Sequence, residues 1–339
     1  MSVCGASLTR LVRVLSAVSA LAFPPGSLAA QHSRTVAGRV VVQRAHRAEP
    51  LAGRVVTLHR VGSDSAGAVD SVRSDARGRY QFSFRPFGAE GALYFAAVIH
   101  GGVAYFTAPL GATATDDESG EITVFDTAST GIDIGVRGRH LAISAPSTTG
   151  NRAVIDVFEL GNDSLRTLVQ RRSASGEVQA TWRFPLPDGA VKAAVMRDAG
   201  DIAPAAVTVG NGEAAVFAPF APGLKQLALR YELPPAQDSL TIPAIETTGV
   251  FEVLLEEPSA RVSGGGIAAQ GPVTVEGKSL QRFLAQDVAS SAVLTITLPA
   301  PRAADGGRTW LIVLLGAVVA VAISALLLWR SRDTPRAAA

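Results

Sequence analysis

The chain holds a single cysteine, Cys4, among its 339 residues. One cysteine forms no disulfide within the chain, whereas small secreted domains commonly depend on several. Cys4 also precedes the apolar part of an N-terminal segment that has the features of a secretory signal peptide, so we expect it to be removed. It stands on the wrong side of that apolar part for lipid attachment. The exported region must therefore rely on hydrophobic cores, which we interpret as typical of a bacterial envelope protein.

Clustered charge of one sign is missing as well. The chain carries 31 Lys and Arg residues against 29 Asp and Glu residues, and the region between its two terminal segments is nearly neutral. A nucleic-acid-binding protein needs a clustered basic face. We therefore expect no nucleic acid among the partners of this protein.

The common catalytic and cofactor-binding motifs are also absent from the sequence. It contains no G-x-S-x-G elbow, no H-E-x-x-H, no G-x-x-x-x-G-K-[ST] and no C-x-x-C. An acidic run at 116–118, followed by Glu121, lacks the alternating spacing of a calcium loop and is interpreted as a solvated linker. No two of the five histidines are closer than 13 positions, so none form a local metal pair: His32, His46, His59, His100 and His140. We predict no catalytic residue, no cofactor and no enzymatic activity.

One conditional metal site depends on where the signal peptide is cut. Cleavage after Ala29 leaves a mature chain that begins with Ala30, Gln31 and His32. A free amine, two backbone amides and a third-position imidazole form a square-planar nitrogen site for Cu(II) or Ni(II). Cleavage after Ala30 moves His32 to the second position and abolishes that site.

Both ends of the sequence carry targeting or anchoring features. Residues 1–30 have a positive start, a ten-residue apolar core and small residues for cleavage, as in a signal peptide. Residues 310–329 form a run of twenty without charge, with Trp310 and Trp329 at its two ends, which is long enough to cross a bilayer as a helix. A basic tail, 330–339, follows. These features predict a single-pass protein of the cytoplasmic membrane, with its N-terminal ectodomain outside and its C-terminus in the cytoplasm.

The region 31–110 alternates apolar and polar residues over short runs, which is typical of half-buried strands. Four segments match, in order, a family pattern of a G-x-V strand, a Pro-led loop, a V-x-L strand and a hairpin: Gly38-Arg39-Val40, Pro50-Leu51-Ala52, Val56-Thr57-Leu58 and Ser74-Asp75-Ala76-Arg77-Gly78-Arg79-Tyr80-Gln81-Phe82. This region resembles the carboxypeptidase-regulatory-like family of transthyretin-type β-sandwiches. The resemblance implies a fold, and a non-catalytic accessory module, rather than a particular function.

The remaining ectodomain is also rich in strand patterns. Residues 111–235 are predicted to form a second β-sandwich, with tight turns at Asp188-Gly189 and Asn211-Gly212. Residues 236–300 form either a third small β-domain or the continuation of the second, and 301–309 form a juxtamembrane stalk. The expected fold class is all-β, with tandem antiparallel sandwiches followed by one transmembrane helix.

Four aromatic residues stand in two neighbouring strand patterns, at Tyr94, Phe95, Tyr105 and Phe106. We interpret them as sandwich core, with a ligand-binding face as the alternative. The leading functional hypothesis is a non-enzymatic, membrane-anchored envelope protein that binds a protein or a glycan, or serves as an accessory subunit of a membrane complex. The alternatives are a surface protein with a cleavable C-terminal sorting tail and an envelope hydrolase.

Overall fold

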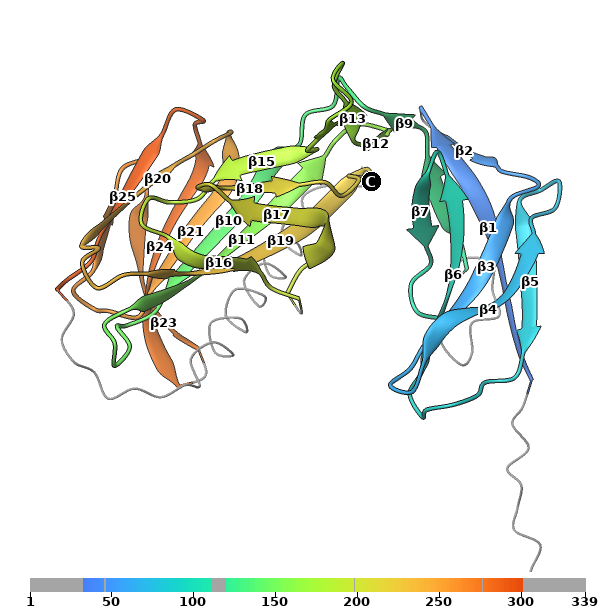
Figure 1. Cartoon of the computed structure of the whole chain (residues 1–339), viewed down its shortest axis with the longest axis horizontal. Coiled ribbons are helices and arrows are strands. Elements are labelled where there is room, and N and C mark those ends of the chain that lie inside the picture. The colour runs from blue at the N-terminus through green and yellow to red at the C-terminus, as the bar shows by residue number, and fades with distance from the viewer. Residues whose placement is uncertain (1–32, 46, 111–119, 198, 276, 301–339) are drawn as a thin grey trace, which may run out of the picture.

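The computed structural model describes residues 33–300, except residues 46, 111–119, 198 and 276. This part of the chain is all-β, as predicted, and its strands form several sheets with sandwich-like packing (Figure 1). None of the described segments forms a helix with the length and hydropathy of a membrane span. The predicted span at 310–329 and the predicted signal peptide at 1–30 lie outside the described residues.

The first unit packs two four-stranded sheets against each other. The first sheet has the path β2-β1-β5, with β8 also paired to β1: β1 (Arg34–Arg44), β2 (Arg47–Pro50), β5 (Arg79–Phe84) and β8 (Ile122–Phe125). The second sheet has the order β4-β3-β6-β7: β3 (Val55–Val61), β4 (Ala66–Arg73), β6 (Leu93–His100) and β7 (Val103–Phe106). One core lies between them because alternate residues of β1, β3, β5 and β6 point inward.

Two turns in this unit follow from their residue types. The Asp75 carboxylate accepts hydrogen bonds from the backbone N–H groups of Arg77 and Arg79, both at 2.8 Å. Gly78 then takes a φ of +77°, which glycine adopts without steric cost. Gly101 and Gly102 close the β6–β7 hairpin with φ values of +56° and +78°, the positive values that a tight primed turn requires.

The second unit is organised by one seven-stranded sheet. Its strand order is β16-β19-β11-β10-β21-β24-β23: β10 (Gly135–Ile143), β11 (Arg152–Asn162), β16 (Val191–Val195), β19 (Gly223–Leu233), β21 (Thr248–Leu255), β23 (Ala268–Val275) and β24 (Lys278–Val288). β10 and β21 pair in parallel, from Val136 opposite Thr248 to Ile143 opposite Leu255. The predicted regions 111–235 and 236–300 therefore contribute strands to the same sheet.

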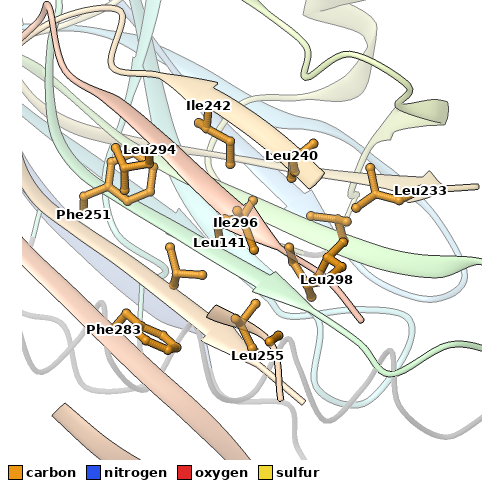
Figure 2. Packing of buried hydrophobic residues seen from close by; sticks show 14 of the residues in the cluster. Leu141, Leu233, Leu240, Ile242, Phe251, Leu255, Phe283, Leu294, Ile296 and Leu298 are labelled. Atoms are coloured by element: carbon orange, nitrogen blue, oxygen red, sulfur yellow. The ribbon is translucent and has the colours of Figure 1, made fainter. Parts of the chain in front are cut away.

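Two three-stranded sheets cover one face of this large sheet. The first has the order β15-β18-β17: β15 (Trp182–Pro185), β17 (Val207–Gly210) and β18 (Glu213–Val216). The second has the order β20-β25-β22: β20 (Ser239–Pro243), β22 (Arg261–Ser263) and β25 (Val293–Thr297). Figure 2 shows the core beneath the second small sheet, where Leu240, Ile242, Leu294 and Ile296 pack on residues of the large sheet. A separate core lies beneath the first small sheet.

The remaining elements are short. They are one 3-10 turn, η1 (Pro204–Ala206), and two two-stranded ladders: β9 (Thr127–Ala128) with β12 (Thr167–Leu168), and β13 (Arg171–Arg172) with β14 (Val178–Gln179). The β17–β18 hairpin turns at Asn211 and Gly212, with φ values of +52° and +75°, as predicted. The expectation of purely antiparallel sheets is wrong, because β1 with β8, β9 with β12 and β10 with β21 are parallel. Parallel neighbours need a long crossover connection, which periodicity along one strand does not report.

Candidate functional site: an exposed apolar sheet face

The solvent-facing side of the β4-β3-β6-β7 sheet carries large apolar side chains. Strand alternation sends Val56, Leu58 and Arg60 of β3 into the sandwich, and the residues between them point outward. The same alternation operates on β6 and β7. We call the outward set the outer face, and on these three strands its members are Val55, Thr57, His59, Val61, Leu93, Phe95, Ala97, Ile99, Ala104 and Phe106.

Strand register brings these side chains into contiguous cross-strand rows. His59 lies opposite Phe95, and their rings stack with centroids 5.3 Å apart and an interplanar angle of 9°. Phe106 meets Phe95 edge-on, with centroids 5.6 Å apart. Aromatic pairs at such separations interact favourably beyond their buried area. Three strands thus contribute to one aromatic ridge.

The outer face is open to solvent. Ile99 is 69% exposed, Phe106 is 56% exposed and Leu93 is 53% exposed, although a folded chain normally buries such side chains. Of the ten large apolar residues that are exposed in the described chain, five belong to this face: Val55, Val61, Leu93, Ile99 and Phe106. Scattered single apolar residues are ordinary on a protein surface, but a contiguous group marks an interaction site.

Charge is nearly absent from this surface. On β3, β6 and β7 the outer face includes no acidic side chain, and His59 is its one titratable group. The adjoining edge strand β4 contributes Ser71, whose hydroxyl is 3.0 Å from that of Thr57, and Arg73, whose guanidinium donates to the carbonyl of Gly53 at the margin. The surface is thus apolar and aromatic, with small hydroxyl residues beside it.

The four aromatic residues in the neighbouring strand patterns divide between the two sides of the sheet. Tyr94 and Tyr105 are buried in the core, as predicted, and their hydroxyls are hydrogen-bonded. The Tyr94 hydroxyl accepts from the Phe87 N–H at 3.1 Å, and the Tyr105 hydroxyl lies 2.7 Å from that of Thr167. The core prediction is wrong for Phe95 and Phe106, which point outward because each follows an inward residue on its strand.

A buried ion pair, Arg139 with Asp156, lies on the face of the large sheet that the two small sheets cover, between the two hydrophobic cores of that face. The Arg139 guanidinium donates two hydrogen bonds to the Asp156 carboxylate, at 3.0 and 2.7 Å, and both side chains are buried. The rings of Phe158 and Phe251 lie 4.7 and 5.3 Å from the guanidinium carbon. Phe158 belongs to one core and Phe251 to the other, so the ion pair joins the two.

The opposite face of the same sheet holds a buried histidine with two acidic neighbours. His140 Nδ1 is 2.9 Å from a Glu252 oxygen, and the Arg282 guanidinium donates to the other Glu252 oxygen at 2.6 Å. Burial alone would lower the pKa of His140, but the hydrogen bond to Glu252 and the charges of Glu252 and Glu159 outweigh it and raise that pKa to about 9. Glu159 acts through charge, since its carboxylate is 3.8 Å from Nε2, beyond hydrogen-bonding distance.

Gly138 leaves the space in which these groups meet. A Cβ at this position would lie 2.7 Å from a Glu159 carboxylate oxygen and 3.0 Å from His140 Nε2. Burial disfavours the ionised form of Glu252, yet the hydrogen bonds and charges of His140 and Arg282 lower the pKa of that carboxyl overall. Imidazolium and carboxylate therefore stabilise each other across β10 and β21, and the Arg282 guanidinium pairs with the same carboxylate.

These titratable residues do not assemble a metal centre in the described part of the chain. No group of three or more His, Cys, Asp or Glu side chains there is arranged to hold a metal ion. His100 lies beside Asp126, with 3.3 Å between Nε2 and the carboxylate, far along the chain from both His59 and His140. The conditional copper or nickel ligand His32 and the acidic run 116–118 lie outside the described residues, whereas Glu121 pairs with Arg39 at 2.6 Å.

Comparison with known proteins adds little to this picture. No family model matches the chain, and no curated protein matches it. Among solved structures, it is similar to a point mutant of the M1 zinc metallopeptidase from Deinococcus radiodurans, with 12% identity and a TM-score of 0.30. The same mutant bound to a Tyr-Ser-Ala substrate gives 12% identity and a TM-score of 0.29. Each match covers 48% of this chain and 42% of the peptidase chain, less than half of that protein's length. Similarity at this level supports no conclusion about activity.

Proposed function

We propose that this chain is a non-enzymatic envelope protein that is anchored by a single span and binds a partner through the outer face. In this proposal the tandem sandwiches lie outside the cytoplasmic membrane, the span is 310–329, and 330–339 is the cytoplasmic tail. The observation that supports it is the concentration, on one sheet face, of half of the large apolar side chains that are exposed among the described residues.

The chemistry of the outer face favours a protein surface over a glycan. Sugar-binding faces combine an aromatic platform with several polar groups that hydrogen-bond hydroxyls, because leaving those hydroxyls unpaired is costly. Here the ridge of Phe95, Phe106 and His59 is surrounded mainly by Val, Leu, Ile and Ala. Apolar and aromatic residues with few charges characterise the buried centre of a protein–protein interface.

The proposal is tested by capture from envelope extracts. Tagged full-length protein is expressed in a bacterial host, extracted in mild detergent and analysed for co-purifying chains, its own included. The Phe95→Ser, Phe106→Ser double variant should lose the captured partner. Leu165→Ser is the matched control, because Leu165 is an exposed apolar residue of the second unit. Equal capture by the double variant and the wild type would exclude the outer face as the binding surface.

A separate measurement addresses the anchor. Deleting residues 310–339 should move the protein from the membrane fraction to the soluble fraction, because about twenty apolar residues hold a chain in the bilayer. Mature protein that lacks the C-terminal segment in wild-type cells would favour the sorting-tail alternative instead. A full-length mature chain in the cytoplasmic membrane would exclude it.

A further inference from the structure

We infer that the partner of the outer face is a second copy of this chain, packed face to face about a two-fold axis. This inference rests on the proposed function and makes it more specific. It assigns a homodimer interface to the outward residues of β3, β4, β6 and β7.

The charge distribution of the outer face suits self-association. A two-fold interface brings the same patch of both copies together, so any charged residue near its centre meets a like charge. On β3, β6 and β7 the outer face presents no acidic residue and no Lys or Arg. Arg73 stands at the margin on β4, where it is engaged with the Gly53 carbonyl. Two copies therefore meet without like-charge repulsion at the centre of the interface, and a partner recognised through charge would find nothing to pair with there.

The sizes of the outward side chains also suit a copy of the same surface. One cross-strand row, the small row, has small side chains on three successive strands, Ser71, Thr57 and Ala97, and ends at Phe106 on β7. The neighbouring row contains the stacked rings of His59 and Phe95. Packed sheets interdigitate their side chains at a mean separation of about 10 Å and a crossing angle of about −30°. A two-fold axis beside the small row lets the stacked His59 and Phe95 rings of each copy lie over the three small side chains of the other.

The area of the outer face predicts a small interface, so dimer formation depends on both copies being anchored in the same membrane. Three strands about 24 Å long and the shorter β7, about 14 Å long, spaced about 4.8 Å apart, give a face of roughly 400 Å². Two such faces bury roughly 800 Å², less than the roughly 1,200 Å² at which standard interfaces begin. A membrane anchor holds copies in one plane and raises their effective concentration, so a small apolar interface suffices. The predicted span at 310–329 provides that condition.

Single-cysteine cross-linking of the membrane-embedded full chain tests this inference. The natural sequence simplifies the experiment, because Cys4→Ser removes the one native thiol. Thr57→Cys then places a thiol in the small row. A disulfide requires Cα atoms within about 7 Å, less than the separation of packed sheets, so a short bis-maleimide is the suitable reagent.

The chain offers a matched control on the other sheet of the same unit. The Thr35 hydroxyl is 3.3 Å from that of Ser83 on the solvent-facing side of β1 and β5, just as the Thr57 hydroxyl is 3.0 Å from that of Ser71. Thr35→Cys therefore places a thiol in an equivalent chemical setting on a face that is not apolar. We expect the cross-linked dimer to form about tenfold faster from Thr57→Cys than from Thr35→Cys.

Two further variants separate interface loss from unfolding. Phe106→Glu in the Thr57→Cys background should abolish the cross-linked dimer, because each copy would bury a glutamate without a counterion in an apolar contact. Leu165→Glu adds the same charge at an exposed apolar site elsewhere and should leave the yield unchanged. The melting temperature of Phe106→Glu should match that of Leu165→Glu, since both side chains are exposed in the folded chain.

Each possible result decides the question. A cross-linked species with the mass of two chains, lost in Phe106→Glu and kept in Leu165→Glu, supports the inference. Equal dimer yields from Thr57→Cys and Thr35→Cys overturn it. If Thr57→Cys is linked instead to a chain of different mass, the second-copy inference fails while the proposed binding function stands. If capture and cross-linking both detect no partner at the outer face, the two fail together.

Discussion

Replacing Asp156 by leucine should destabilise the second unit strongly, because it leaves the buried Arg139 charge without its counterion. Two guanidinium N–H groups lose acceptors at 3.0 and 2.7 Å, and the remaining protein acceptor is the Pro243 carbonyl at 3.5 Å. Breaking a buried pair in this way costs about 3–5 kcal/mol. The rings of Phe158 and Phe251 still contact the cation and offset part of that cost, so we expect about 3 kcal/mol.

The double variant Arg139→Met, Asp156→Leu is the informative comparison. Apolar residues of similar size in place of a buried ion pair are often neutral or stabilising, so its unfolding free energy should lie within about 1 kcal/mol of the wild type. Urea unfolding followed by Trp182 fluorescence measures both values, because Trp182 is buried and its ring centroid is 5.3 Å from that of Phe158. Phenylalanine at positions 310 and 329 removes the other two tryptophans. An Asp156→Leu protein as stable as the double variant would refute the reasoning.

Three further outcomes follow from the described geometry. His140 binds its proton more tightly in the folded state, so the free energy of unfolding should fall by about 3 kcal/mol as pH rises from about 6.5 to about 9, and His140→Gln should flatten that pH dependence of urea unfolding. Gly78→Ala should lower the melting temperature more than Gly53→Ala: both positions have positive φ, but only at Gly78 would the new Cβ collide with a backbone carbonyl. Gly38→Ala should be at least as damaging as Gly78→Ala in the same melts, because its Cβ would collide with the backbone of Gly120.

Local pattern accounts for the features of the fold that depend on nearby residues. The two glycine-containing hairpins, at Gly101-Gly102 and Asn211-Gly212, follow from the positive φ that primed turns require. The Asp75 turn follows from a carboxylate that accepts from the backbone N–H groups of its own turn. These features were predictable because each one is determined within a few residues.

Strand β24 was not predicted, although it lies beside β21 along seven paired positions. Its sequence, KSLQRFLAQDV, lacks a clean alternation of apolar and polar residues. Arg282 occupies a sheet position because it pairs with Glu252, thirty residues away. The parallel pairing of β10 with β21 was equally invisible, because it joins segments more than a hundred residues apart. Periodicity along one strand contains no information on such distant neighbours.

The buried ion pairs nevertheless left a signal in the sequence. Asp156 interrupts the apolar run AVIDVF, and Glu252 interrupts VFEVLL. A charged residue in the middle of such a run either faces solvent or is buried with a partner. Arg139 and His140, adjacent on β10, supply partners on opposite faces of the sheet. Isolated charges in apolar strands of this chain were therefore a usable signal of pairing, which the sequence analysis did not exploit, while the identity of each partner required the sheet order.

Sequence pattern is also ambiguous at the outer face, because it does not show whether an apolar strand is buried on one side or on both. The run LYFAAVI on β6 is apolar at every position, a pattern typical of a strand buried on both sides. Here the sandwich core covers only the side of Tyr94, Ala96 and Val98, and the other side is open. Ile99, at 69% exposed, contributes little to folding. Ile99→Thr should therefore change the free energy of unfolding, measured in urea, by less than about 0.5 kcal/mol. The same substitution should weaken partner capture through the outer face, because a buried interface needs the apolar area that folding does not use. Loss of stability together with retained capture would reverse that assignment and return Ile99 to the folding core.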